Sequence, residues 1–151
     1  MNHQINRRHL LAGAGALTVS ILAPGEKARA WVATGGVASR PPLKPTRLAS
    51  YISINADGGA TAWFGKPDMG QGTDVGVAQM VAEELDLPSE RVTVVFGDTA
   101  VTMNQGGASG SFGVQAGGKA MANAAAEARL ILVEMASKKL GVPVDGLTVE
   151  N

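Results

Sequence analysis

Two glycine-rich segments contain the residues that could take part in chemistry. Residues 66–73 have the sequence Lys-Pro-Asp-Met-Gly-Gln-Gly-Thr, and residues 105–111 have the sequence Gln-Gly-Gly-Ala-Ser-Gly-Ser. Each segment places glycines and small hydroxyl or amide residues where an expected strand passes into an expected helix. Backbone N–H groups of such segments can face an anionic ligand, because glycine allows a close approach. Two such segments predict one shared binding site.

The first segment is expected to lie between a β-hairpin and a helix. Residues 51–54 alternate in the strand period, residues 60–65 are also typical of a strand, and residues 57–58, Asp-Gly, indicate a turn between them. A helix is expected to begin at Thr73 and to be stopped by Pro88. Its apolar side has helical spacing and consists of Val77, Met80, Val81 and Leu85.

The second segment is expected to lie between a strand and a long helix. Residues 91–96 form a β-branched run suited to a buried strand, which Gly97 and Asp98 close. An alanine-rich helix is predicted over residues 113–140, with Gly141 as its C-cap. The helices and strands on both sides therefore determine where the two glycine-rich segments meet.

These elements predict an α+β fold for residues 50–151. Its expected order is β-hairpin, helix, strand, glycine-rich loop, long helix and strand. The last strand is expected at residues 147–151, and because the sequence ends on it without a turn or cap, more chain is expected beyond it. Residues 31–49 contain glycine and proline pairs and are expected to be a linker. The core is expected to be thin, since aromatic residues make up only 4% of the chain.

Residues 1–30 have the pattern of an export signal rather than of a folded unit. Arg7 and Arg8 provide a positive start, residues 10–23 form a short apolar run, and residues 28–30 have the small-x-small form of a cleavage site. The paired arginines favour a twin-arginine signal and therefore a periplasmic location. An ordinary secretory signal or a retained membrane anchor is the alternative interpretation.

The composition excludes several classes of function. Beyond residues 1–30, nine basic and twelve acidic side chains remain, a net charge of −3 without a basic cluster, so nucleic-acid binding has no support. The sequence has no cysteine, and its two histidines, His3 and His9, lie in the predicted signal. The usual zinc, haem and iron–sulfur ligands and Ser-His-Asp or Cys-His catalysis are therefore excluded from the remainder. Any redox chemistry must come from a bound cofactor.

Two generic nucleotide-binding motifs are present in loose form. Residues 70–76 match G-x-G-x-x-x-G, and Asp98 follows the next strand where a ribose-binding acid would stand. However, the preceding strand is expected in an antiparallel hairpin, and residues 66–69 separate it from the first glycine, which makes a dinucleotide-binding fragment the weaker alternative. Residues 113–120 satisfy G-x-x-x-x-G-K, but Ala120 stands where a P-loop needs Ser or Thr. A P-loop is therefore not expected.

A more specific resemblance covers residues 64–151. Its segments are Met69-Gly70-Gln71-Gly72-Thr73, Val81–Asp86, Gly97-Asp98-Thr99, Gly106–Ser111 and Ala124–Arg129. In combination they resemble the molybdopterin-binding large subunits of the xanthine dehydrogenase and aldehyde oxidase family. The resemblance is closest to the exported branch of isoquinoline 1-oxidoreductase beta subunits and nicotinate dehydrogenases. In that branch a twin-arginine signal soon followed by Met-Gly-Gln-Gly is the usual order.

The resemblance implies a molybdenum–molybdopterin cofactor, in its cytosine dinucleotide form. It places the Gln71 amide beside the oxo group of the metal, where an NH₂ can donate and a carbonyl can accept. It implies no catalytic residue and no metal ligand in this chain, because sulfurs of the cofactor hold the metal. Gln71 could instead cap the helix or face water, and the two serines could cap the long helix. The implied cofactor-binding residues are Gly70, Gln71, Gly72, Gly107, Ala108, Ser109, Gly110 and Ser111.

Members of this family hydroxylate N-heterocycles or aldehydes, with a glutamate of a later segment as the base. That segment has no counterpart in this sequence, so we expect an N-terminal part of a large subunit that contributes cofactor contacts and is not active alone. The implied partners are the remainder of the large subunit or a split partner chain, an iron–sulfur small subunit and a cytochrome subunit. The alternative is an exported small α+β binding module without catalysis.

Overall fold

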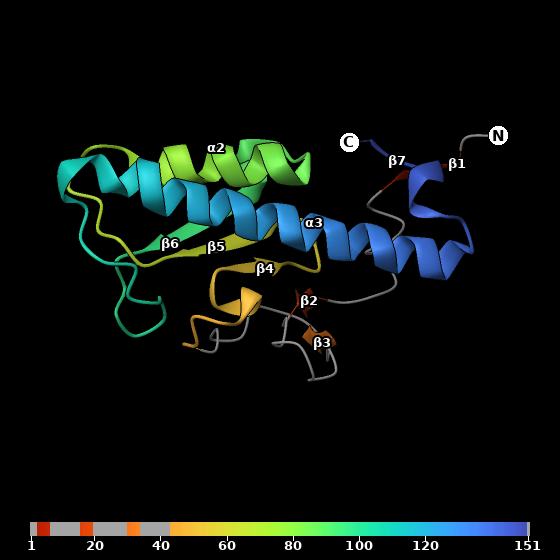
Figure 1. The fold of residues 1–151 in the computed structure, drawn as a ribbon, viewed down its shortest axis with the longest axis horizontal. Helices are drawn as coiled ribbons and strands as arrows, with labels where there is room; N and C mark the ends of the chain where they lie inside the picture. The colour runs from red at the N-terminus through yellow and green to blue at the C-terminus, as the bar shows by residue number, and fades with distance from the viewer. Residues whose placement is uncertain (1–2, 7–15, 20–29, 34–42, 151) are drawn as a thin grey trace.

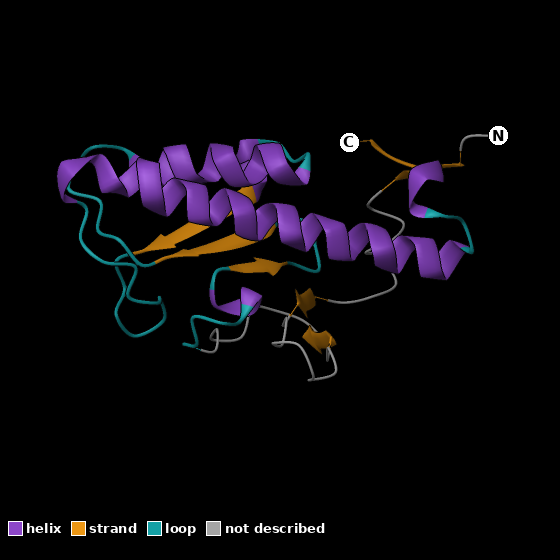
Figure 2. Ribbon diagram, viewed as in Figure 1, coloured by secondary structure: helices purple, strands orange, loops and turns teal. Residues whose placement is uncertain are grey.

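The protein has an α+β fold, as the sequence predicts. The structure is a computed structural model that describes residues 3–6, 16–19, 30–33 and 43–150. Helices α2 and α3 lie side by side on one face of a mixed β-sheet (Figures 1 and 2). The helices are α2 (Thr73–Leu85) and α3 (Lys119–Leu140), and the strands are β1 (His3–Asn6), β2 (Ala16–Val19), β3 (Ala30–Ala33), β4 (Ile52–Ile54), β5 (Ala60–Phe64), β6 (Val92–Phe96) and β7 (Leu147–Glu150).

Strands β4 and β5 form the predicted hairpin. They pair antiparallel, with Ile52 opposite Ala62 and Ile54 opposite Ala60. The turn between them begins at Asn55, whose N–H donates to the Gly59 carbonyl at 2.8 Å. All residues of both strands are buried, because β4 and β5 occupy the middle of the strand order β3-β2-β4-β5-β6.

Strand β6 pairs parallel to β5, with Ala60 opposite Val92 and Phe64 opposite Phe96. Helix α2 makes the crossover between them, as a parallel connection requires. The two strands therefore end at the same edge of the sheet, and the segments that follow them, residues 65–72 and 97–108, begin next to each other. In Figure 1 this edge lies at the left.

The prediction that residues 91–96 form a buried strand is only partly correct. A strand is present, but β6 lies at the end of the strand order and is paired with β5 alone among the described residues. Of its five residues only Val92 is buried, and the Phe96 side chain is 41% exposed. The β-branched run therefore reflects strand propensity at an edge rather than burial on both faces.

Helix α3 follows a wider turn rich in glycine. Residues 113–118 form one turn of π-helix, and the α-helix then runs to Leu140. Gly141, at φ 66°, donates its N–H to the Ser137 carbonyl at 2.9 Å, which confirms the predicted C-cap. A side chain at Gly118 would come within 2.7 Å of the Met80 sulfur, so glycine there permits the close approach of α2.

The core lies between the sheet and the two helices. Phe64 is the largest fully buried side chain among the described residues, and α3 contributes mostly alanine to the core. Ile52 and Ile54 come from β4, Val77, Val81 and Leu85 come from α2, and Met121, Ala124, Ala125 and Ala128 come from α3.

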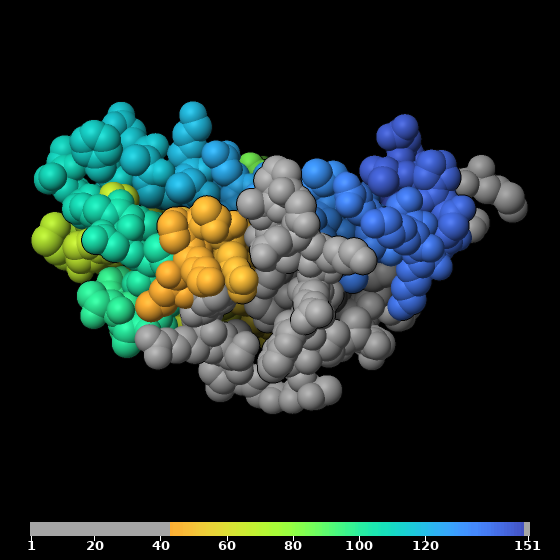
Figure 3. Space-filling model, turned by 60° about the horizontal axis from the view of Figure 1, so that its bottom comes forward, coloured from red at the N-terminus to blue at the C-terminus, as the bar shows by residue number. Residues whose placement is uncertain are grey.

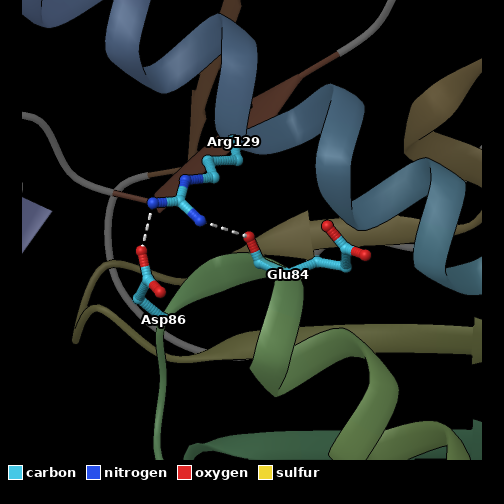
Figure 4. A network of polar contacts seen from close by, with 3 residues as sticks. All are labelled: Glu84, Asp86 and Arg129. Atoms are coloured by element: carbon cyan, nitrogen blue, oxygen red, sulfur yellow. Dashed lines mark hydrogen bonds and ion pairs between the residues drawn. The ribbon is translucent and has the colours of Figure 1, made fainter.

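A polar contact joins the C-terminal end of α2 to the middle of α3 (Figure 4). Arg129 of α3 forms an ion pair with Asp86, the residue that caps α2, and it donates a second hydrogen bond to the Glu84 carbonyl at 3.4 Å. Both side chains of the pair are more than a third exposed. Because the pair is partly exposed, it adds little stability to the packing of the two helices.

Short single-turn helices and outer strands complete the described residues. The 3₁₀ turns are Leu48–Ser50, Ser89–Arg91, Ser109–Ser111 and Val144–Gly146. Strand β7 pairs parallel with β1. Most of the predicted export signal, residues 1–30, and residues 34–42 of the predicted linker, residues 31–49, fall outside the described residues. Both assignments stay predictions. Among the helices that are described, none has the length and apolar character to cross a membrane.

Candidate functional site

Asp68 organises the first glycine-rich loop. Its Oδ1 accepts hydrogen bonds from the N–H groups of Gly70 at 2.7 Å and Gln71 at 3.1 Å. Its Oδ2 accepts from the Thr73 N–H at 2.6 Å, the Thr73 hydroxyl at 2.9 Å and the Asp74 N–H at 3.3 Å. The Thr73 hydroxyl, and with it the N–H groups of Gly70, Asp74 and Thr73, lower the pKa of Asp68 from 3.8 to about 2, although desolvation opposes them. The carboxylate is therefore the anion at the N-terminus of α2.

This arrangement changes what the first loop can offer to a ligand. The sequence predicts backbone N–H groups that face an anionic ligand, but four of those groups in residues 70–74 already donate to Asp68. Gly70 and Gly72 have positive φ values of 97° and 71°, which glycine adopts without strain. Both are exposed, and no atom lies within 4 Å of where a Cβ would stand on either. The first loop thus offers a ligand the exposed backbone of two glycines, but few N–H groups that could bind an anion.

Gln71 is exposed at the top of this loop and is held by its own neighbours. Its Oε1 accepts from the Met69 N–H at 2.7 Å, and its Nε2 donates to the Pro67 carbonyl at 3.3 Å. The amide does not cap α2, whose start has no side-chain cap at Gly72. One hydrogen of the NH₂ group remains for an external acceptor.

The second loop keeps its polar groups exposed. Gly107 has open space around its Cα, and Ser109–Ser111 forms a tight turn in which Gly110 and Ser111 have φ values of 61° and 64°. The hydroxyls of Ser109 and Ser111 are exposed and make no hydrogen bond with any other residue that the structure describes. No serine caps the helix that follows. A positive φ is strained for a serine, which is a common feature of ligand-binding turns.

The two loops lie next to each other at the edge where β5 and β6 end (Figure 1). The Lys66 ammonium donates to the Gly107 carbonyl at 2.7 Å, and the Gly65 N–H donates to the Gln105 side-chain oxygen at 3.2 Å. Both contacts run from the end of β5 to the second loop. The proximity of the two predicted segments is therefore a property of the fold, while ligand binding by their residues stays a prediction.

A cleft of about 440 Å³ opens beside the second loop. The segment that begins at Leu43 borders it, and Figure 3 shows that segment in orange next to the green residues of the loop. Its lining is Leu43, Gly65, Gly97, Thr99, Thr102, Met103 and Asn104. The described residues contain no cluster of carboxylates or histidines that could hold a metal ion.

The geometry also bears on the generic nucleotide motifs. The parallel β5–α2–β6 unit has the outline of a dinucleotide-binding unit, but Asp68 occupies the helix N-terminus where a pyrophosphate would bind. Asp98 is a turn former, since its Oδ1 accepts from the Ala100 N–H at 2.8 Å. Residues 113–118, which precede Lys119 in the other motif, form a π-helical turn rather than an open phosphate-binding loop. Neither motif therefore has the geometry of a nucleotide site.

The sequence patterns did not predict the three residues whose side chains hold the two loops in place by hydrogen bonds. Asp68, Lys66 and Gln105 lie in the two segments, but the sequence patterns assign a role only to Gln71 and to the glycines and small residues. A recognisable pattern exists for part of the role of Asp68, because an Asp side chain commonly accepts from the N–H two residues on, as it does here from Gly70. No local pattern predicts the burial of Lys66.

Comparison with known proteins identifies relatives of the chain. Residues 28–151 match the molybdopterin cofactor-binding domain family. The chain is 39% identical over 111 residues to a subunit of nicotinate dehydrogenase from Pseudomonas putida, an alignment that covers 74% of this chain and 9% of that protein. It is 37% identical over 62 residues to a subunit of a probable xanthine dehydrogenase from Bacillus subtilis, an alignment that covers 41% of this chain and 8% of that protein. The aligned regions thus span less than a tenth of each relative.

Proposed function

We propose that this chain, which belongs to the family of molybdopterin cofactor-binding domains, forms part of the pterin site of a xanthine dehydrogenase-type oxidoreductase with its two glycine-rich loops. The observation that carries the proposal is the hydrogen bond from Lys66 to Gly107, which joins the two loops at one edge of the sheet. A ligand at this edge can contact residues 70–72 and 107–111 together.

The chemistry of the two loops fits a phosphorylated pterin. The hydroxyls of Ser109 and Ser111 are exposed donors suited to the oxygens of a phosphate. The first loop has its N–H groups committed to Asp68, so it suits a flat, polar ring that lies over Gly70 and Gly72. We therefore place the phosphate nearer the second loop and the ring with its metal nearer Gln71.

The roles of this chain are to bind and to orient. When bound, the cofactor supplies the electron-transfer chemistry, for which the chain itself has no cysteine and, beyond residues 1–30, no histidine. The free NH₂ hydrogen of Gln71 donates to an oxygen of the cofactor and fixes its orientation. The turn at residues 109–111 and the bare glycines let the backbone approach closely and exclude water from that contact.

The activity proposed for the assembled protein is hydroxylation of an N-heterocycle or an aldehyde. The relative with the longer alignment is named as part of nicotinate dehydrogenase, and nicotinate is an N-heterocycle. The catalytic base and the substrate pocket would belong to the remainder of the large subunit or to a split partner chain. An iron–sulfur subunit and a cytochrome subunit would be the further partners. We further propose the cytosine dinucleotide form of the cofactor and export through the twin-arginine pathway to the periplasm, for which Arg7 and Arg8 are the support.

The direct test is analysis of the assembled protein that contains this chain. Molybdenum is measured by plasma mass spectrometry, pterin by the fluorescence of its oxidised form, and the nucleotide by chromatography after acid hydrolysis. We expect equimolar molybdenum and pterin, with cytidine monophosphate released. A complete complex without either would contradict the proposal and favour a small binding module.

Export has a separate test. Replacement of both arginines by lysine, Arg7→Lys with Arg8→Lys, is expected to retain the protein in the cytoplasm, as measured by cell fractionation. Unchanged export of the double variant would contradict the twin-arginine route while leaving the cofactor proposal intact.

A further inference from the structure

Lys66 is a buried cation at the base of the second loop. Its side chain is only 4% exposed, which is rare for lysine because an ammonium is strongly hydrated in water. Its Nζ donates to the Gly107 carbonyl at 2.7 Å. It forms no ion pair with another residue that the structure describes, so this charge is compensated locally by a carbonyl dipole.

The Lys66 side chain passes through space that a glycine leaves free. A Cβ on Gly117 would stand 2.9 Å from both Cδ and Cε of Lys66 and 2.7 Å from Phe64, so the stem passes where Gly117 has no side chain. A Cβ on Gly106 would stand 3.8 Å from the ammonium. A distance of 3.8 Å is an ordinary contact, so the space for Lys66 depends on Gly117 rather than on Gly106.

The contact also fixes the direction of one peptide group. The peptide between Gly107 and Ala108 is trans, since the described residues contain no cis peptide bond, and in a planar trans peptide the C=O and the N–H point in opposite directions. The Gly107 carbonyl points at the buried ammonium, so the Ala108 N–H points away from that ammonium, and Gly107 itself is exposed. No described residue accepts a hydrogen bond from this N–H.

We propose that Lys66 is a positioning residue for the cofactor: it holds the Gly107 carbonyl inward and thereby aims the Ala108 N–H at an acceptor oxygen of the pterin. The inference rests on the proposed function of the two loops. It adds a residue of the first segment that acts on the second without touching the ligand. The buried positive charge also favours an anionic oxygen over a neutral one at this N–H.

Two variants and a control test the inference in the assembled protein. Lys66→Met keeps an unbranched stem of similar length but removes the charge and the donors. Lys66→Arg keeps both. Lys119→Met, at an exposed position, is the matched control. The three readouts are the melting temperature without cofactor, hydrogen exchange of the peptide that contains residues 105–112 with and without cofactor, and the rate of pterin release measured by fluorescence.

We expect Lys66→Met to fold with an unchanged or higher melting temperature, because removal of a buried charge relieves its desolvation. It should lose the protection from exchange that the cofactor gives to residues 105–112, and it should release pterin about tenfold faster, the effect of one weakened hydrogen bond. Lys66→Arg should keep part of the protection of residues 105–112 and should release pterin at a rate between those of the wild type and Lys66→Met. Lys119→Met should match the wild type in both measurements.

Two results would overturn the inference. Equal pterin release and equal protection in Lys66→Met and the wild type would show that Lys66 does not orient the loop. A lower melting temperature in Lys66→Met, with faster exchange throughout the chain, would show a role in folding rather than in positioning. Failure of the proposed function is distinct, since wild-type protein would then contain no pterin at all.

Discussion

The carboxylate of Asp68 accepts hydrogen bonds from both the backbone N–H and the hydroxyl of Thr73, at 2.6 Å and 2.9 Å. Thr73 is the first residue of α2 and is 4% exposed. One acidic side chain thus fixes both the start of the helix and the shape of the loop before it. The M-G-Q-G sequence is therefore held in place by the acid that precedes it.

Replacement of this acid is expected to loosen the loop. Asp68→Asn keeps the size of the side chain but removes the charge and one acceptor oxygen, so several N–H groups lose a partner. We expect a melting temperature lower by several degrees, measured by circular dichroism. Thr73→Val removes only the hydroxyl and is expected to cost about 1 kcal/mol. An Asp68→Asn variant as stable as the wild type would contradict the role of the carboxylate.

The contribution of Asp68 is expected to depend on pH. Its pKa is lowered in the folded state to about 2 from an ordinary 3.8, so its stabilisation is complete above pH 3.8 and is lost as the pH falls from 3.8 to about 2. The difference in urea midpoint between wild type and Asp68→Asn should be constant at neutral pH and should shrink steadily as the pH falls below 3.8. A difference of the same size at pH 3.8 and at pH 2 would exclude the ionised carboxylate as its cause.

Two glycine-to-alanine substitutions are expected to have opposite effects. A Cβ at Gly117 would stand 2.7 Å from Phe64, so Gly117→Ala is expected to destabilise by about 1–3 kcal/mol. Gly76 lies within α2 with nothing within 4 Å of a Cβ, so Gly76→Ala is expected to stabilise by about 0.5–1 kcal/mol. Chemical denaturation measures both. Equal effects of the two substitutions would contradict the close packing at Gly117.

Gln71 is expected to matter for the cofactor more than for the fold. Its side-chain hydrogen bonds are exposed, so Gln71→Ala is expected to change stability by about 0.5 kcal/mol. Pterin retention after gel filtration is expected to fall about tenfold, because one donor to the cofactor is lost. Gln79→Ala, at an exposed position of α2, provides the matched control. Full retention in Gln71→Ala would remove Gln71 from the site.

The elements that follow from local patterns were predicted well. The hairpin at residues 51–65, the start of α2 at Thr73 and the C-cap at Gly141 depend on strand alternation, helical spacing and a glycine that tolerates positive φ. The parallel pairing of β5 and β6 joins residues distant in the sequence, and the edge position of β6 depends on what lies beyond it. Neither is a local property, so the exposure of Phe96 was not predicted.

The candidate site was predicted in outline but not in its internal contacts. Glycine and serine patterns identified the two segments and implied that they meet. The sequence did not indicate that Asp68 would use the N–H groups of the first loop, because that depends on the conformation of residues 68–74. It also did not indicate the contact of Lys66 with Gly107, which requires a gap left by Gly117 in a third segment.

Strand β6 lies at an edge of the described sheet to which a further strand could be added. Its backbone pairs with β5 on one side, and no described strand occupies the other. A strand of another polypeptide segment that paired there would extend the sheet by one strand. The same open row of amide and carbonyl groups would let two copies adhere edge to edge at high concentration, so a partner strand would also act as protection against self-association.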